Sequence, residues 1–148
     1  MWAFGIVLVL AACSSGGDGD GGSTSAPTAA PTLTGTFVDA PVSGLSYATS
    51  SGLAGTTNTQ GQFNYRSGDV ITFSYGQTTI GSVQAAPQIT PWTAFGLSVP
   101  DQADPRWVNL SRFLQTFNNQ LPAVTPAIAG QPSINFNQAT GVFGTDPN

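Results

Sequence analysis

The sequence predicts a mainly β fold: a small β-sandwich of about five to seven short strands with one C-terminal amphipathic helix. Three observations predict it. Short alternations of apolar and polar residues recur from Gly35 onward, and turn residues separate them. The region is rich in β-branched, aromatic and Gly residues, a composition that suits half-buried strands. A later segment repeats its apolar residues at the period of a helix.

The strands are predicted from the alternation and from the turns between them. We expect strands at Thr36–Asp39, at Gly44–Thr49, around Phe63 and Tyr65, at Val70–Tyr75 and at Thr78–Val83. In Val70–Tyr75, the side chains of Ile71, Phe73 and Tyr75 point to one face. Asn58–Gly61 is a predicted turn, and Gly76–Gln77 is a predicted two-residue hairpin loop that begins with Gly. Strands so close in the sequence imply a meander or a sandwich.

The helix is predicted from a start signal and an apolar stripe. Asp104 is a good N-cap, and Pro105 suits the first helical position. The stripe consists of Trp107, Leu110, Leu114, Phe117 and Leu121. We expect the helix to end near Asn119, before Pro122, and to pack on one face of a sheet. After Pro122 the sequence is rich in Pro, Gly and polar residues, and Ile134 and Phe136 mark one further short strand.

The chain begins with an uncharged apolar run, Trp2–Ala12, which is far shorter than the roughly 20 residues that span a bilayer. The run ends in Leu10, Ala11, Ala12 and Cys13, and Cys13 is the single cysteine. This ending resembles the lipobox of bacterial lipoproteins. The resemblance implies that residues 1–12 are a signal peptide and that Cys13 is lipidated, which would anchor the exported protein to a membrane. Two alternatives are an ordinary cleaved signal peptide and a buried apolar helix with an inert thiol.

The predicted organisation has four parts. Residues 1–12 are the signal peptide, and 13–32 are a Gly, Ser, Thr, Ala and Pro-rich tether that cannot bury apolar surface. Residues 33–121 are the β-sandwich module with its helix, and 122–148 are a Pro and Gly-rich tail. Ser14, after the cysteine, resembles the sorting pattern of outer-membrane lipoproteins, so the outer membrane is the expected location.

The predicted module carries two further resemblances. Thr56, Thr57, Gly61, Phe63 and Gly68 occupy positions typical of the carboxypeptidase regulatory-like (transthyretin-like) β-sandwich modules of secreted bacterial proteins. Thr90–Pro91 and the run Asn109–Phe117 (NLSRFLQTF) resemble a module found at the start of many bacterial surface lipoproteins. In that second group further domains commonly follow. This implies an alternative, in which the chain is the N-terminal accessory part of a larger secreted hydrolase or surface protein.

Residue types that are missing from the sequence argue against most catalytic chemistry. There is no His, Lys or Glu, so the usual base of Ser and Cys nucleophiles and the P-loop lysine are both missing. We expect no enzyme activity, no cofactor and no metal site. The formal net charge is −4 with three Arg, which predicts no nucleic-acid partner.

The remaining candidate residues have structural interpretations. The acids of the module and tail are Asp39, Asp69, Asp101, Asp104 and Asp146, expected in turns, loops and caps. A loop calcium site built from some of them with backbone carbonyls is a lesser alternative. The aromatics Tyr47, Tyr65, Tyr75, Trp92 and Trp107 are expected in the core, with an exposed glycan-stacking face as the alternative. Arg66, Arg106 and Arg112 are expected to be solvated or in a local ion pair.

These observations predict a membrane-anchored lipoprotein that acts as a binding, adhesion or assembly module of the cell envelope. An envelope protein and a glycan are the two partner classes left open.

Overall fold

The computed structural model describes residues 28–137 and 144–145. The predicted signal peptide, Cys13 and most of the predicted tether lie outside the described residues. The elements in chain order are β1 (Thr32–Phe37), β2 (Ser46–Thr49), β3 (Ala54–Thr56), β4 (Gln62–Arg66), β5 (Val70–Tyr75), β6 (Thr78–Gln84), β7 (Gln88–Ile89), α1 (Pro91–Ala94), α2 (Pro105–Thr116), α3 (Pro126–Ala129), β8 (Ile134–Asn135) and β9 (Gly144–Thr145).

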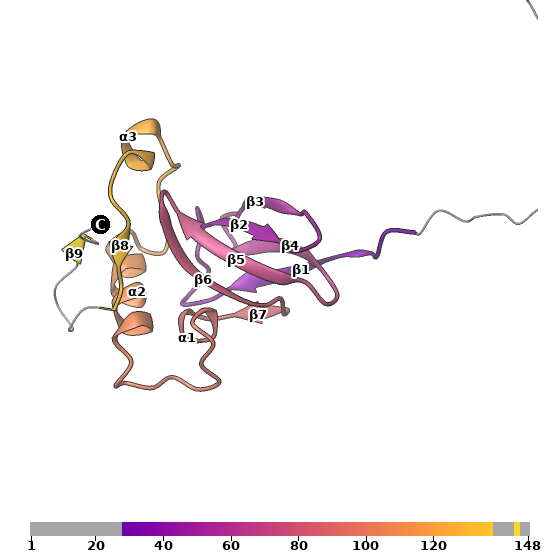
Figure 1. Ribbon diagram of the computed structural model, residues 1–148, viewed down its shortest axis with the longest axis horizontal. Coiled ribbons are helices and arrows are strands. Elements are labelled where there is room, and N and C mark those ends of the chain that lie inside the picture. Colours follow the sequence, from indigo (N-terminus) through magenta and orange to yellow (C-terminus); the bar gives the residue numbers. More distant parts are fainter. Residues whose placement is uncertain (1–27, 138–143, 146–148) are drawn as a thin grey trace, which may run out of the picture.

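The strands form two main sheets, so the predicted mainly β class is confirmed (Figure 1). One sheet has the order β4-β1-β7, with β1 antiparallel to β4 and parallel to β7. The other has the order β3-β2-β5-β6 and is antiparallel throughout. The short strands β8 and β9 pair with each other.

The central hairpin, β5 and β6, forms as the sequence predicts. Ile71, Phe73 and Tyr75 alternate with more exposed residues and are all buried. Tyr75 pairs with Thr78 across the two-residue loop, and Gly76 has φ 58° there. That conformation is accessible to Gly without a steric cost, which explains why the loop begins with this residue.

Phenylalanines from both sheets meet in one core. Phe37 of β1 and Phe63 of β4 belong to one sheet, and Phe73 of β5 belongs to the other. The Phe73 ring centroid lies 5.0 Å from that of Phe37 and 5.2 Å from that of Phe63. All three residues are at most 1% exposed, so the sheets pack through these rings.

The strand boundaries differ from the predicted ones in the first half of the domain. β1 begins at Thr32, not Thr36, because pairing with Arg66 of β4 starts there. It ends at Phe37, and Asp39 lies in the following turn. Gly44 has φ 85°, outside strand geometry, so β2 begins at Ser46 rather than at Gly44. Strands β3 and β7 were not predicted from the sequence.

Helix α2 begins where it was predicted, with the Asp104 carboxylate accepting a hydrogen bond from Arg106 N–H at 3.0 Å. Its predicted end was wrong. The helix ends at Thr116, because Asn118 and Asn119 adopt left-handed backbone conformations with φ 50° and 58°. Leu110 and Leu114 are buried in the core, whereas Phe117 is 36% exposed. Leu121 is buried too, but it lies beyond the end of the helix.

Two short helices, α1 and α3, were not predicted. Each begins like α2, with a capping residue followed by Pro: Thr90–Pro91 and Thr125–Pro126. Helices α1 and α2 contact each other, and Figure 1 shows β8 beside α2. The predicted short strand at Ile134 is present as β8, and Phe136 is 5% exposed within the core. The described part of the predicted tail therefore packs onto the domain.

Candidate binding cleft

The described acidic residues do not gather at one place. Among them and the other described residues, no three His, Cys, Asp or Glu side chains come close enough to hold a metal ion together. Asp146 lies outside the described residues. Asp101 is exposed in the loop before α2 and accepts a hydrogen bond from Ala103 N–H at 2.9 Å.

Asp69 joins two turns at one end of the domain, which confirms its predicted structural role. Its carboxylate accepts from Arg66 N–H at 2.7 Å, from Ser51 Oγ at 2.8 Å and from Ser50 Oγ at 3.0 Å. Burial alone would raise the pKa of this carboxyl. These hydrogen bonds outweigh burial and lower the pKa to about 2, so Asp69 is ionised at neutral pH. Both of its carboxylate oxygens accept hydrogen bonds.

Asp39 lies in the turn after β1, but its carboxyl group does not bond to the backbone of that turn. The Asp39 Oδ2 atom is buried and has no hydrogen-bond partner among the described residues. Burial raises the pKa of this carboxyl, and side-chain hydrogen bonds from Ser111 and Gln115 only partly oppose the shift. Its backbone carbonyl accepts from the side-chain amide of Asn119 at 3.1 Å.

The tyrosines are core residues, as expected: Tyr47, Tyr65 and Tyr75 are each at most 8% exposed. Trp92 and Trp107 are half-buried and meet edge to face with ring centroids 6.0 Å apart. Trp107 also donates its indole N–H to Asp101 O at 2.6 Å. These five aromatics therefore do not form the exposed glycan-stacking face that was the alternative.

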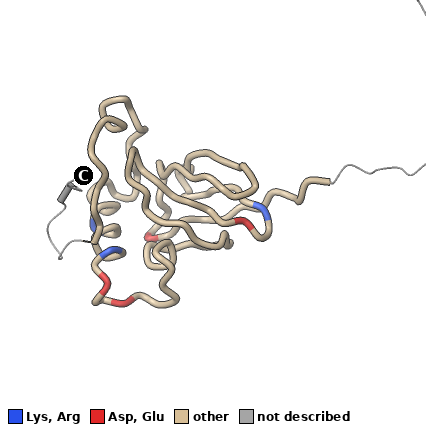
Figure 2. Tube along the Cα trace, viewed as in Figure 1, with Lys and Arg blue, Asp and Glu red and all other residues tan. Residues whose placement is uncertain are grey.

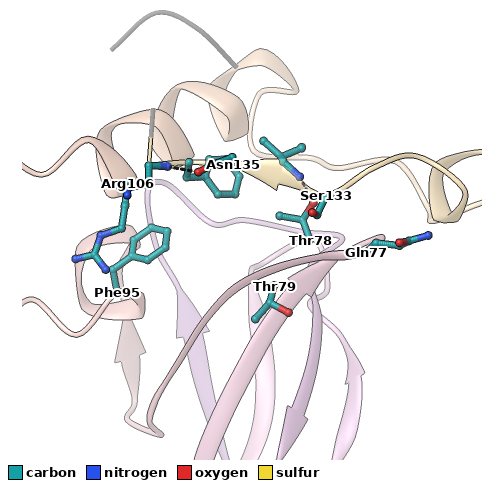
Figure 3. Close-up of a pocket in the computed structure, with 10 residues that line it drawn as sticks. Gln77, Thr78, Thr79, Phe95, Arg106, Ser133 and Asn135 are labelled. Carbon is teal, nitrogen blue, oxygen red and sulfur yellow. Dashed lines mark hydrogen bonds between the residues drawn. The ribbon is translucent and has the colours of Figure 1, made fainter. Parts of the chain in front are cut away.

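Arg106 borders the hollow that we call the Arg106 cleft, with a volume of about 380 Å³. The cleft is lined by residues 77–79, Phe95, Arg106 and residues 133–137. Figure 3 shows Arg106 and Phe95 side by side at one end of the cleft and Gln77 at the other. The cleft is thus assembled from the β5–β6 hairpin, the end of α1, the first turn of α2 and the segment around β8.

The guanidinium of Arg106 is held on two sides. It forms a forked ion pair with Asp104, with Nη2 at 2.5 Å and Nε at 3.0 Å from carboxylate oxygens. It also stacks over the Phe95 ring at 5.3 Å from the centroid. The hydrogen bond from Arg106 lowers the pKa of Asp104 and raises that of Arg106, so both stay charged. This confirms the expected local ion pair.

The cleft itself carries little net charge, because Asp104 compensates Arg106. Figure 2 shows how few charged positions lie along the described chain. The other polar groups at the cleft are the amides of Gln77, Asn135 and Asn137 and the hydroxyls of Thr79 and Ser133. Such groups can donate and accept hydrogen bonds without requiring a charged partner.

An apolar groove adjoins the cleft and shares Gln77, Thr78 and Ile134 with it. Between them, Thr78 Oγ1 accepts from Ile134 N–H at 2.8 Å and fixes the β8 segment against β6. The groove has a volume of about 250 Å³, and rings from Tyr75, Phe113 and Phe117 line it. The two hollows together offer a polar and an apolar surface side by side.

Of the residues that line the cleft, Arg106 alone was among the candidate residues for a site, whereas Gln77, Ile134 and Phe136 were predicted only as loop or strand residues. They lie in segments that are far apart along the chain, and their types are common on any polar surface. A signal was present for one part: the Thr90–Pro91 start of α1 places Phe95 at the end of that helix.

In the part of the chain that the structure describes, no helix has the length and apolar character needed to cross a bilayer. Comparison of the chain with models of known protein families, with curated proteins and with solved structures found no match in any of the three.

Proposed function

We propose that the chain is an exported lipoprotein, anchored to a membrane by lipid on Cys13, whose β domain acts as a binding module of the cell envelope. One observation carries this proposal. The single cysteine directly follows an uncharged apolar run that ends in Ala11 and Ala12. Each methylene that a lipid chain buries contributes about 0.8 kcal/mol, so two or more chains give stable attachment. The proposed location is the outer membrane, on the basis of Ser14.

The proposed arrangement of the domain is a β-sandwich of the transthyretin-like kind. Its support is the contact between Phe73 of one sheet and Phe37 and Phe63 of the other. Two of the five positions that carry the resemblance, Thr57 and Phe63, are buried. Thr57 Oγ1 accepts from Leu45 N–H at 3.0 Å, a structural role that explains a Thr there.

The Arg106 cleft is the proposed binding surface, and its proposed partner is an uncharged polar molecule of the glycan class. The volume lies within the usual range for ligand sites, which is about 300–1,000 Å³. Amides and hydroxyls at the cleft match the hydroxyl groups of a sugar, while the Phe95 ring supplies an apolar edge. Compensation of Arg106 by Asp104 argues against an anionic ligand.

The membrane attachment is tested by metabolic fatty-acid labelling of the full chain in a bacterial host, together with detergent partitioning. The native chain should incorporate label and enter the detergent phase. The Cys13→Ser variant should do neither, because the sulfur that carries the lipid is gone. A Cys13→Ser variant that still incorporates label would rule out lipidation at this residue.

The cleft is tested by binding of the unlipidated full chain, carrying Cys13→Ser, to an array of bacterial envelope glycans. We expect binding to at least one glycan and a loss of about tenfold or more with Asn135→Ala, which corresponds to about 1.4 kcal/mol. The matched control is Asn64→Ala, an exposed position on β4 that does not line the cleft. If no glycan binds, or if both variants bind alike, the cleft is not the glycan site.

A further inference from the structure

The apolar groove beside the Arg106 cleft has walls from three elements. Tyr75 is the last residue of β5, Phe113 lies on α2 with Phe117 one turn further along, and Ile128 lies on α3. The Phe113 ring connects the other two rings, with its centroid 6.0 Å from that of Tyr75 and 5.4 Å from that of Phe117. The groove therefore presents adjoining aromatic and aliphatic surface around a volume of about 250 Å³.

Hydrogen bonds hold the outer wall of the groove against the β5–β6 hairpin. Gln77, in the loop of the hairpin, donates its side-chain amide to Ala129 O at 2.6 Å. Tyr75 donates its hydroxyl to Pro122 O at 3.2 Å. Figure 1 shows α3 beside this end of the hairpin. Residues 122–129 are thus tied to the hairpin at both ends, so the groove is formed before any ligand enters.

The polar side chains at the groove are already bonded to the backbone. Besides the two bonds above, Thr78 Oγ1 accepts from Ile134 N–H at 2.8 Å, and Gln131 donates its side-chain amide to Ala127 O at 3.2 Å. No charged side chain of the described residues lines the groove. A hydrocarbon can therefore cover the rings without taking a hydrogen bond away from the protein, and removing their apolar surface from water is favourable.

The groove is too narrow for the face of another protein. A stable interface buries about 800 Å² on each partner around an apolar centre. Among the exposed large apolar side chains of the described residues, Phe117 is the only one that lines the groove. A slim chain fits better. An apolar cavity of about 150 Å³ holds a benzene ring, so by proportion the groove holds a chain of about eight to ten carbons.

We propose that the apolar groove binds the hydrocarbon chain of a single-chain amphiphile whose uncharged polar head lies in the Arg106 cleft. The two hollows share Gln77, Thr78 and Ile134, so one molecule can occupy both. The position of the head rests on the proposed function of the cleft, whereas the chain site depends on the groove alone. The inference narrows the ligand from glycans in general to a sugar that carries an alkyl chain.

The test is calorimetric titration of the unlipidated full chain, carrying Cys13→Ser, with alkyl glucosides below their critical micelle concentrations. We expect saturable binding of n-octyl glucoside and an affinity that rises about threefold to fourfold for each methylene between hexyl and octyl. The rise should level off near about ten carbons, because the groove is then full. No binding, or an affinity that keeps rising at the same rate up to dodecyl glucoside, would overturn the chain site.

Two variants locate the chain. Ile128→Trp fills the groove from α3, a helix without buried residues, so it should fold and should weaken octyl glucoside binding about tenfold or more. Phe117→Ser removes an exposed ring from the groove and should have a similar effect. Val124→Ser is the matched control, because Val124 is 38% exposed and does not line the groove. Equal affinities in Phe117→Ser and Val124→Ser would overturn the proposal.

Further outcomes separate this inference from the proposed function of the cleft. Octanol carries the chain without the sugar. If octanol binding is lost in Ile128→Trp while Asn135→Ala leaves octyl glucoside binding unchanged, the chain site stands and the glycan function fails. Binding on the glycan array without binding of any alkyl chain would leave the proposed function and overturn the inference. Self-association that is lost in Phe117→Ser, without glucoside binding, would overturn it in favour of a second copy of the chain.

Discussion

The ring of Phe73 on β5 lies edge-on against the ring of Phe63 on β4, with centroids 5.2 Å apart and ring planes at 79°. Edge-to-face packing is a favoured geometry for aromatic pairs. Because β4 and β5 belong to different sheets, this contact is one of the places where the two layers depend on each other. The stability of the domain should therefore be sensitive to Phe73.

Replacing Phe73 by Ala should lower the free energy of unfolding by about 3–5 kcal/mol, because it removes a fully buried ring and leaves a cavity between the sheets. Urea denaturation followed by circular dichroism measures the change. Val70→Ala, on the same strand but 44% exposed, is the control and should cost about 1 kcal/mol or less. Equal losses for the two variants would mean that the sheets do not share this core.

The stability of the domain should depend on pH through Asp69. The folded-state pKa of about 2 lies below the unfolded value of 3.8, so the hydrogen bonds of the carboxylate stabilise the fold fully above about pH 4. This contribution is lost as the pH falls through about 2. Asp69→Asn should be clearly less stable than the native chain at pH 6, and the gap should shrink at pH 2.

Urea denaturation at the two pH values measures that gap, and other titrating groups cancel because both proteins contain them. The exposed variant Gln60→Ala is the control and should follow the native pH dependence. A gap of the same size at pH 6 and pH 2 would show that the Asp69 carboxylate does not provide the stabilisation.

Asp104 should stabilise α2 mainly as its N-cap. Asp104→Ala removes the acceptor for Arg106 N–H and should cost about 1 kcal/mol in urea denaturation. Asp104→Asn removes the charge but keeps a good capping side chain, so it should retain most of the stability. If Asn and Ala are equally destabilising, the ion pair with Arg106 and not the cap is the main contribution.

Gly81 should be required for the packing of α1 on β6. A Cβ atom at this position would overlap the backbone carbonyl oxygen of Ala94. Gly81→Ala should therefore cost about 1–3 kcal/mol in thermal or urea denaturation, because backbone cannot move aside as a flexible side chain can. Thr79→Ala, at an exposed position on the same strand, should cost less; equal costs would show that α1 can shift.

The sequence was most informative where one local signal determines the structure. The alternation in Val70–Tyr75 predicted the buried face of β5, and the Asp104–Pro105 pair predicted the start of α2. The same cap-and-Pro signal precedes α1 and α3, so those helices could have been recognised. Their length of four residues left no apolar stripe to support them.

The features that escaped prediction depend on contacts between distant segments. The residues of β3 are all exposed and those of β7 number only two, so neither has a usable alternation. The apolar stripe continued to Leu121, but the left-handed Asn118 and Asn119 end α2 early. The Arg106 cleft could not be predicted for the same reason, since it joins residues from separate parts of the chain.

The most direct test of the central proposal is the intact mass of the protein purified from bacterial membranes. A lipoprotein should give a polypeptide that starts at Cys13, with residues 1–12 removed and the mass of the attached lipid added to its first residue. A polypeptide that retains residues 1–12 and carries an unmodified Cys13 thiol would contradict the account.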